Sequence, residues 1–406
     1  MSRNLRLFYL YRLLATSYLY VPIFMLFRAA RGLSFFESLA LGAIYSAVVI
    51  VVEVPTGVFA DRLGRRRSML VGALTMTASC LVAASATTFG EFAIAEALAA
   101  MSLALCSGAD SAYLFDLLLE HGRVHEYSKR ESTASAWHLL GNAIAYAAGG
   151  MLATIDLVLP FYATAAVASL AAVVATLLTD DRARLAARVE PAAKVLRSWT
   201  RDMTAAIRDV TSNARLAWLI GYSATVFVLL RATDYLYQPY LATRGLDRLE
   251  IGMLYAGVAL VASLVAYRTH VLRRRYSDEL LLWGLLGGLA VSFLGLAGAS
   301  AGPWMLSLLV VQAIASGIYS PLTKPLLNAE ITDSSRRAAV LSIESIARRA
   351  AIGIFAPLVG FYGKTNVMAL CGVVGLGGLV VLALTRGRRS TVAVPVPVAV
   401  TTERTR

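Results

Sequence analysis

The chain alternates between long apolar runs and short polar stretches. About 20 helical residues are needed to cross a hydrocarbon core about 30 Å thick, so each run of that length predicts one membrane-spanning helix. The runs cover residues 7–27, 38–60, 68–88, 91–119, 132–154, 156–179, 216–238, 249–268, 280–300, 303–327, 340–361 and 366–385. The pattern therefore predicts an all-α integral membrane protein with twelve transmembrane helices.

A polar segment in the middle of the chain divides these runs into two equal sets. We expect a first half over residues 1–179, a linker over 180–215, a second half over 216–385 and a tail over 386–406. Apolar residues recur in the linker at three- and four-residue spacing between basic ones, which predicts an amphipathic helix at the inner membrane surface. The tail has no pattern that could bury a face, so we expect it to be disordered.

Composition supports the membrane assignment. Hydrophobic residues make up 58% of the chain and charged residues 16%, whereas soluble domains average about 45–50% and about 25%. The net charge of +13 comes from residues between apolar runs, so we expect no nucleic-acid partner. No cleavage site follows the first run, which is expected to be retained. The three cysteines and the histidine pair at 121 and 125 lack metal-site spacing, so we expect neither a metal nor another cofactor.

The cationic residues predict the orientation of the chain. Most of the 38 Lys and Arg residues fall in alternate connections between the runs, and Arg28 and Arg31 are among the few in the others. Lys and Arg in short loops stay on the cytoplasmic side. We therefore expect both termini to be cytoplasmic, in a multi-pass protein of the cytoplasmic (inner) membrane.

The polar stretch between the second and third runs, residues 57–67, reads G-V-F-A-D-R-L-G-R-R-R. Gly57 allows helices to approach closely, and Gly64 permits a turn. Asp61 can accept hydrogen bonds from a helix N-terminus or pair with Arg65, and the arginines can bind lipid phosphates or a carboxylate. Residues 268–275 repeat the basic cluster without the acid or the second glycine, as a degraded copy in the second half.

Two sets of helices, a charged linker and a G-x-x-x-D-R-x-G-R-R-R loop make the chain resemble the major facilitator superfamily over residues 1 to about 385. The resemblance implies a secondary transporter whose halves rock around a central cavity. It also implies a latch that holds the outward-facing state against the eleventh helix near residues 338–342. The latch would consist of the residues that match the motif and one acid on the fourth helix: Gly57, Asp61, Arg62, Gly64, Arg65 and Asp116.

Drug-proton antiporters of this superfamily carry an Arg early in the fourth helix and a G-x-x-x-G-P-x-x-G-G run in the fifth. Here the fourth helix has Glu96 and no arginine. Residues 141–150 keep the outer glycines but have Ala145-Tyr146 in place of the central Gly-Pro. The partial pattern favours export coupled to protons.

Charged and polar residues inside the spans are the candidates for substrate or proton binding, because charges kept in a membrane generally face the protein interior or a wet cavity. Glu53 lies about 12 Å along a helix from Asp61, which is deep enough for a protonated form. Arg231 and Asp234 are spaced either to pair with each other or to contact the substrate. The full set of candidates is Glu53, Asp110, Asn142, Arg231, Asp234, Gln312 and Arg348.

The absence of a G-x-x-x-x-G-K-S/T loop predicts transport driven by a gradient rather than by ATP. We expect a monomer among membrane lipids that moves a small organic solute by alternating access, with proton-coupled efflux as its function. A nutrient importer or uniporter is the alternative within transport, and a non-transporting membrane sensor is the alternative outside it. No nucleophile-base pair is evident in the sequence, so we do not expect an enzyme.

Overall fold

The computed structural model describes residues 2–179, 192–300, 302–331, 336–362 and 367–386, except the side chains of residues 54, 58, 61, 128, 192–200, 338, 362 and 386. The expected tail beyond residue 386 and the first part of the linker lie outside this description. Helices form the framework: α1 (Ser2–Ala15), α2 (Phe24–Ala30), α3 (Phe35–Leu63), α4 (Arg65–Ser85), α5 (Phe89–Cys106), α6 (Ala109–Glu120), η1 (Val124–Glu126), α7 (Tyr127–Ile155), α8 (Leu159–Leu177), α10 (Ala192–Ser212), α11 (Ala214–Thr243), α12 (Arg248–Arg275), α13 (Asp278–Gly298), α14 (Pro303–Glu330), α15 (Arg337–Tyr362) and α16 (Val367–Arg386).

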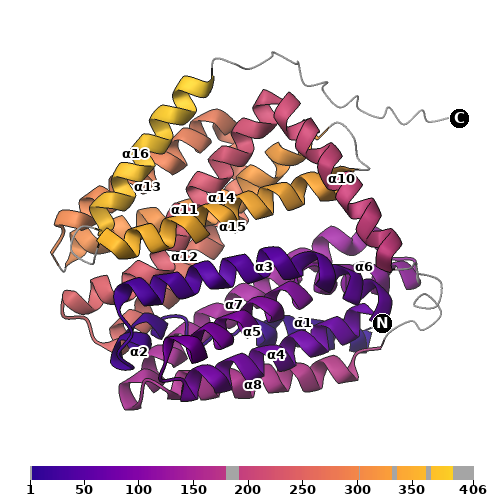
Figure 1. Cartoon of the computed structure of the whole chain (residues 1–406), viewed down its shortest axis with the longest axis horizontal. Helices are drawn as coiled ribbons and strands as arrows, with labels where there is room; N and C mark the ends of the chain where they lie inside the picture. The colour runs from indigo at the N-terminus through magenta and orange to yellow at the C-terminus, as the bar shows by residue number, and fades with distance from the viewer. Residues whose placement is uncertain (1, 180–191, 301, 332–335, 363–366, 387–406) are drawn as a thin grey trace, which may run out of the picture.

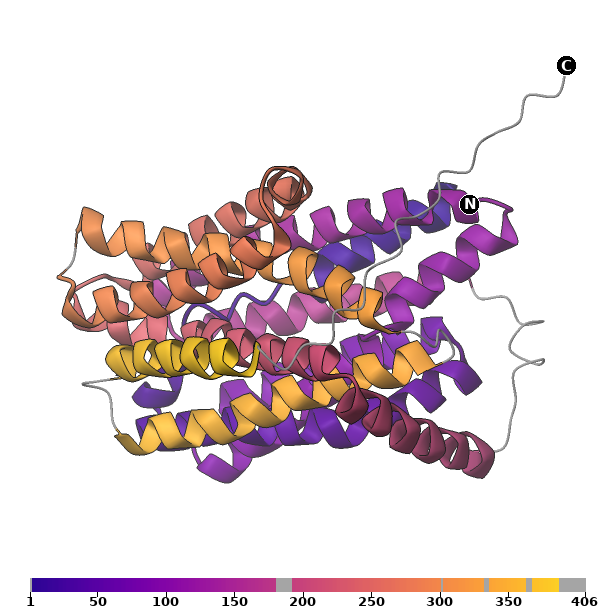
Figure 2. The same ribbon diagram turned by 90° about the horizontal axis from the view of Figure 1, so that it is seen from above.

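The helices form two bundles joined by α10. The first bundle, α1 to α8, is drawn indigo to magenta in Figure 1, and the second, α11 to α16, is drawn pink to yellow. Figure 2 shows that the helices of both bundles run along roughly one direction. We call the end where α1 begins, α3 ends and α10 lies the linker end, and the opposite end, where α2 lies and α16 begins, the far end. Between the bundles, α3 packs against α15 and α7 packs against α12.

Within the described part of the chain, nine helical segments are long and apolar enough to cross a membrane. Large apolar side chains remain exposed on the outer surface, including Phe361 at 81% and Leu384 at 77%. Lipid is the environment that suits such a surface. The other expected spans are broken or more polar: the first run is divided between α1 and α2, and α15 carries Glu344, Arg348 and Arg349.

The expectation of one continuous helix over residues 7–27 is wrong. Residues 16–23 form turns between α1 and α2. Pro22 has no N–H to continue a helix and disfavours helical geometry in the residue before it. The hydroxyls of Thr16 and Ser17 donate to carbonyl oxygens one turn earlier, at 2.7 and 2.6 Å. The break opens the wall of the first bundle and places tyrosine side chains beside the space between the bundles.

Two glycines set helix boundaries that differ from the expected ones. The expected helix over residues 91–119 is divided into α5 and α6, because Gly108 adopts φ +80°, a left-handed conformation that suits glycine. The turn in the motif stretch is tighter than expected. Helix α3 continues through Asp61 to Leu63, Gly64 turns the chain with φ +98°, and α4 begins at the next residue.

The bundles touch at the far end and separate toward the linker end, as α3 and α15 show. A Cβ on Gly360 would lie 2.9 Å from the Cα of Phe36, and a Cβ on Gly353 would lie 3.8 Å from the Cβ of Ser46. Gly57 follows Ser46 by about three helical turns and so shares its face of α3. No heavy atom of the described residues lies within 4 Å of a Cβ placed there. Close packing of Gly57 is therefore not seen among the described residues in this conformation, and it stays a prediction for a state in which the linker end is closed.

Candidate functional site

A cavity of about 310 Å³ lies between the two bundles. It is lined by the turn segment 16–23 and by α2, α3, α4, α5, α7 and α11. Its volume is at the lower limit of small-molecule sites, which span about 300–1,000 Å³. Because both bundles contribute walls, a molecule bound here would contact both halves of the chain.

The first bundle supplies an ion pair between Arg28 of α2 and Glu96 of α5. The guanidinium also donates to the carbonyl oxygen of Ser38 at 3.1 Å and lies 4.9 Å from the ring centre of Phe24. Arg28 lies in the last turn of α2 and is only 5% exposed, so the expectation that it is a loop residue is wrong. Its charge is kept inside because a carboxylate, a carbonyl and an aromatic face all stabilise it.

The second bundle supplies an ion pair on α11. Arg231 Nη1 lies 2.5 Å from Asp234 Oδ2, and both residues line the cavity. Their spacing of three residues places the side chains on neighbouring positions of one helical face. The local pairing expected from the sequence is therefore present, and it lies on the wall where a solute would also meet these groups.

Tyrosines cover much of the wall between the two ion pairs. Tyr18, Tyr45, Tyr146 and Tyr235 line the cavity. Tyr235 interacts electrostatically with all four charged side chains. The wall therefore offers ring faces and hydroxyl groups beside separated positive and negative charges.

Asn142 of α7 also lines the cavity and begins a polar track toward the linker end. Its Nδ2 lies 3.4 Å from Nε2 of His138, one turn earlier on the same helix. His138 interacts electrostatically with Arg12 of α1. Arg12 in turn forms an ion pair with Asp110, at the start of α6. Asp110 thus lies beside the Gly108 break, where the backbone N–H of Ser111 donates to it at 2.7 Å.

The remaining candidates lie in other parts of the bundles. Gln312 is 2% exposed inside the second bundle, where it accepts from the hydroxyl of Tyr237 and donates to Ser292 Oγ at 3.0 Å. Arg348 pairs with Glu344 at 2.8 Å, one turn earlier on α15. Glu53 interacts electrostatically with Arg349 of α15, across the space between the bundles. Their proposed roles in substrate or proton binding stay predictions.

The motif stretch lies at the linker end. Arg62, Arg65 and Asp116 each take part in interactions with other groups, whereas the side chain of Asp61 lies outside the described atoms. Arg66 donates to the carbonyl oxygens of Ala175 and Thr176 at 3.1 and 2.6 Å. A cation at the C-terminus of α8 is favourable because the free carbonyl groups there carry partial negative charge. The latch itself stays a prediction for the opposite conformation.

Contacts between the bundles separate the cavity from the far end. The backbone N–H of Met25 donates to Gln238 Oε1 at 2.7 Å, and Gln238 Nε2 donates to the carbonyl oxygen of Val21 at 2.9 Å. Gln238 is fully buried. Arg248 at the start of α12 donates to the carbonyl oxygen of Ala153 near the end of α7, at 2.7 Å. These bonds join backbone groups of the first bundle to side chains of the second.

The glycine run of α7 explains how the helices approach so closely here. A Cβ on Gly141 would lie 2.7 Å from the carbonyl oxygen of Leu13, and a Cβ on Gly149 would overlap that of Leu19. A Cβ on Gly150 would lie 2.7 Å from the Cα of Gly252 in α12. The outer glycines of this run therefore hold α7 against both the first helix and the opposite bundle.

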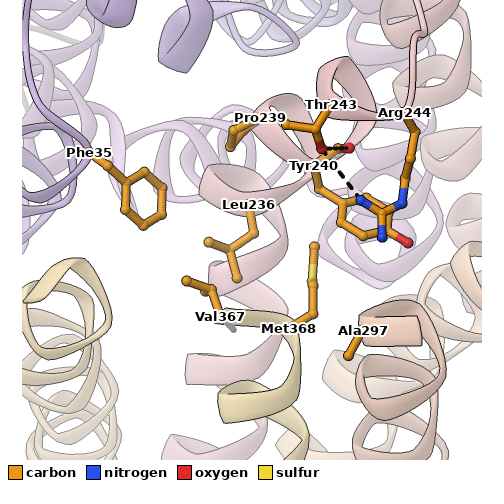
Figure 3. Close-up of a pocket in the computed structure, with 9 residues that line it drawn as sticks. All are labelled: Phe35, Leu236, Pro239, Tyr240, Thr243, Arg244, Ala297, Val367 and Met368. Atoms are coloured by element: carbon orange, nitrogen blue, oxygen red, sulfur yellow. Dashed lines mark hydrogen bonds between the residues drawn. The ribbon is translucent and has the colours of Figure 1, made fainter. Parts of the chain in front are cut away.

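A second cavity of about 250 Å³ lies at the far end. Figure 3 shows Phe35 of α3 facing residues of α11, α13 and α16 across it, with the guanidinium of Arg244 over the ring of Tyr240. That stacking distance is 3.9 Å to the ring centre. Arg244 also donates to the carbonyl oxygen of Ala299 at 2.9 Å. Mostly apolar walls and a single cation give this cavity fewer groups that could orient a polar solute than the cavity between the bundles.

In the described part of the chain, no group of three or more His, Cys, Asp or Glu side chains is placed to hold a metal ion. The arrangement of the central site is instead suited to reversible binding through ion pairs, hydroxyl groups and ring faces.

Comparisons with known proteins agree with this architecture. A sequence model described as Major Facilitator Superfamily matches residues 9–343. The structure is similar to nucleoside transporter NupG, with TM-score 0.75 and 13% identity over 95% of this chain and 97% of that chain. It is also similar to a POT family transporter in complex with thioalcohol conjugated peptide, with TM-score 0.74 and 14% identity over 94% and 96% of the two chains. A third similar structure is peptide transporter POT in complex with sulfate, with TM-score 0.71 and 17% identity over 94% and 93%. A search of curated protein sequences found no match.

Proposed function

This chain belongs to the major facilitator superfamily and is a membrane transporter, and we propose that it moves a small organic solute across the cytoplasmic membrane by alternating access. The observation that carries the proposal is the cavity between the bundles, which holds one Arg-carboxylate pair from each bundle. Separation of the bundles at the linker end would give this cavity a route to one side of the membrane. Closing that end and opening the far end would move a bound solute across.

The linker end is proposed to face the cytoplasm, because the connections at that end carry most of the cationic residues. The described conformation would then be inward-facing. In this state the bundles are apart near Gly57, and in the opposite state the motif around Asp61 would close onto α15. The protein is proposed to work as a monomer surrounded by membrane lipids.

Proton coupling is proposed because both carboxylates of the cavity neutralise arginines. Protonation of Glu96 or Asp234 would remove the negative partner and leave a guanidinium without its carboxylate, which is costly for the buried Arg28 and less costly for the partly exposed Arg231. A carboxylate that alternates between these two states would link proton binding to the strength of solute binding.

Export is the proposed direction, supported by the glycines at both ends of the run in α7, which here form close contacts with α1 and α12. Uptake is the alternative. It is favoured by the likeness in fold to the nucleoside and peptide transporters.

Reconstituted proteoliposomes test the proposal directly. A pH gradient is imposed, a panel of metabolites and drugs is offered, and both solute movement and internal pH are followed. We expect at least one solute to move against its gradient when protons move the opposite way. Movement of every transported solute only down its own gradient, unaffected by Glu96→Gln or Asp234→Asn, would overturn the coupling and identify a uniporter.

A further inference from the structure

The charges of the central cavity are balanced. Its wall carries Arg28 and Glu96 on the first bundle, and Arg231 and Asp234 on the second. Each cation has a carboxylate within ion-pair distance, so the empty site has no net charge from these residues. A solute with one net charge would leave that charge without a partner of opposite sign in the site, which is unfavourable.

The two ion pairs differ in how accessible they are. The side chain of Arg28 is 6% exposed and that of Glu96 is 21% exposed. On the second bundle, Arg231 is 42% exposed and Asp234 is 32% exposed. Arg28 also donates to the carbonyl oxygen of Ser38. It therefore holds Glu96 in position and is not accessible to a solute. The most accessible anion of the first bundle is thus Glu96, and the most accessible cation of the site is Arg231.

The space between these groups has aromatic walls. Tyr235 interacts electrostatically with both ion pairs. Tyr45 interacts with Arg231, Glu96 and also Arg349 of α15, whose own carboxylate neighbour is Glu53. Ring faces bind flat or apolar groups, and phenolic hydroxyls can donate or accept hydrogen bonds. A volume of about 310 Å³ is sufficient for a small organic solute that carries charged groups at two positions.

We propose that the cavity binds a zwitterionic organic solute of about the size of an aromatic amino acid or a dipeptide, with its cationic group on Glu96 and its anionic group on Arg231. The proposal rests on the transport function above and specifies its substrate class. The solute replaces part of each resident ion pair with a new one, so every charge keeps a partner. Because Glu96 and Arg231 lie on different bundles, the bound zwitterion joins them and favours their approach at the open linker end.

Solutes of other charge are disfavoured for separate reasons. A cation or an anion satisfies one bundle but leaves the other ion pair unchanged, so it cannot join the two. An uncharged solute has no group that competes with a carboxylate for a guanidinium, because charge-assisted bonds are about twice as strong as neutral ones. Selectivity therefore arises from the requirement for two opposite charges, one for each bundle.

The test uses four forms of one scaffold: phenylalanine, phenylalaninamide, N-acetylphenylalanine and N-acetylphenylalaninamide, which are zwitterionic, cationic, anionic and neutral. The same four forms of alanine and of the dipeptide Ala-Phe complete the panel. Binding to the purified full chain in lipid nanodiscs is measured as the ligand-dependent rise in unfolding temperature. We expect the zwitterionic form of at least one scaffold to bind about tenfold or more tighter than its three relatives, a difference typical of a lost charged hydrogen bond.

Two variants locate the contacts. Arg231→Gln and Glu96→Gln are each expected to remove the preference for the zwitterion and to weaken its binding by about tenfold to a hundredfold. The matched control is Arg273→Gln, which removes one side of an Arg-carboxylate pair with Asp278 at the linker end, outside the cavity. It should leave the preference unchanged. Glu96→Gln leaves a buried arginine without its carboxylate, so if that variant does not fold, Arg231→Gln alone decides.

Each outcome counts for or against the proposal. Tightest binding by a neutral or singly charged form, no binding by any member of the panel, or a zwitterion preference that survives Arg231→Gln would overturn it. Movement of a neutral solute through reconstituted vesicles would overturn the substrate class while leaving the transport function intact. Zwitterion binding without any movement across the vesicle membrane would support the site and refute transport.

Discussion

Substitution of Gln238 tests how the far end stays closed. Its side chain is fully buried and bonds to the backbone groups of Met25 and Val21 on the opposite bundle. Gln238→Leu would keep the approximate size of the side chain but leave a buried N–H and a buried carbonyl oxygen without a partner. Each unsatisfied group costs about 1–3 kcal/mol, so the closed far end should lose about 2–4 kcal/mol after partial access of water.

This cost falls only on the conformation in which the far end is closed, because water reaches the same groups once the bundles part there. A change of about 1.4 kcal/mol shifts an equilibrium tenfold, so the population with an open far end should rise by about 30- to 700-fold. Where the wild type is almost entirely closed at the far end, the variant should spend a measurable fraction of time open.

The assay is labelling of a cysteine introduced at Ala153, which is fully buried and accepts a bond from Arg248 at the far end. The native Cys80, Cys106 and Cys371 are first replaced by alanine. A membrane-impermeant maleimide added from the outside should label the introduced cysteine faster in the Gln238→Leu background, in proportion to the open population.

Gln312→Leu is the matched control. Gln312 is also a buried glutamine with two side-chain partners, but both lie within the second bundle. We expect it to lower the unfolding temperature about as much as Gln238→Leu without changing the labelling rate. Equal labelling rates in wild type and a well-folded Gln238→Leu variant would refute the view that these two bonds keep the far end closed.

Three further predictions concern other parts of the molecule. Asp61→Asn should slow transport sharply while membrane insertion and unfolding temperature stay near wild type, and a normal transport rate would reduce the motif to a topology signal. Gly150→Leu should prevent far-end closure, because even a Cβ at this position would lie 2.7 Å from the Cα of Gly252. Maleimide labelling of Ala153→Cys from the outside checks this. An unchanged labelling rate would contradict the prediction. Glu126, the last residue of η1, is partly desolvated, which opposes ionisation. Bonds from Arg123 and Arg130 outweigh this effect and hold its pKa below the usual value of 4.5. A depressed pKa stabilises the folded state above pH 4.5, and this effect is lost as the pH falls through the lowered pKa. The difference in unfolding temperature between wild type and Glu126→Gln should therefore vanish in acid. A difference that stays constant with pH would disprove the assignment.

Much of the fold follows from the length and spacing of apolar runs, since the bilayer fixes how many helical residues are needed to cross it. The breaks at Pro22 and Gly108 were missed because transmembrane helices tolerate both residue types when neighbouring groups satisfy the freed backbone. Whether such a residue kinks, breaks or leaves a helix unchanged depends on those neighbours, which one sequence does not specify.

The candidate site was predictable where its contacts are local. Arg231 and Asp234 are three residues apart, so one helix is enough to bring them together. Arg28 and Glu96 are distant in the chain and meet only when α2 packs beside α5. The signal for this pair was a carboxylate inside an expected span, because such a charge generally has a cation or another polar group as its partner. Gln312 and Arg348 are polar like the residues that line the cavity, but their side chains point into the second bundle. Composition does not determine the direction in which a side chain points from a helix.

The balanced charges of the central cavity determine how the transporter would respond to the electrical potential across its membrane. Crossing with a zwitterion alone would move no net charge, so the potential would neither drive nor oppose that step. A proton carried on Glu96 or Asp234 would add one elementary charge, worth about 2.3 kcal/mol per 100 mV. Transport would then depend on the membrane potential only through the proton. The ratio of the current to the solute flux in reconstituted membranes would therefore give the number of protons that accompany each solute.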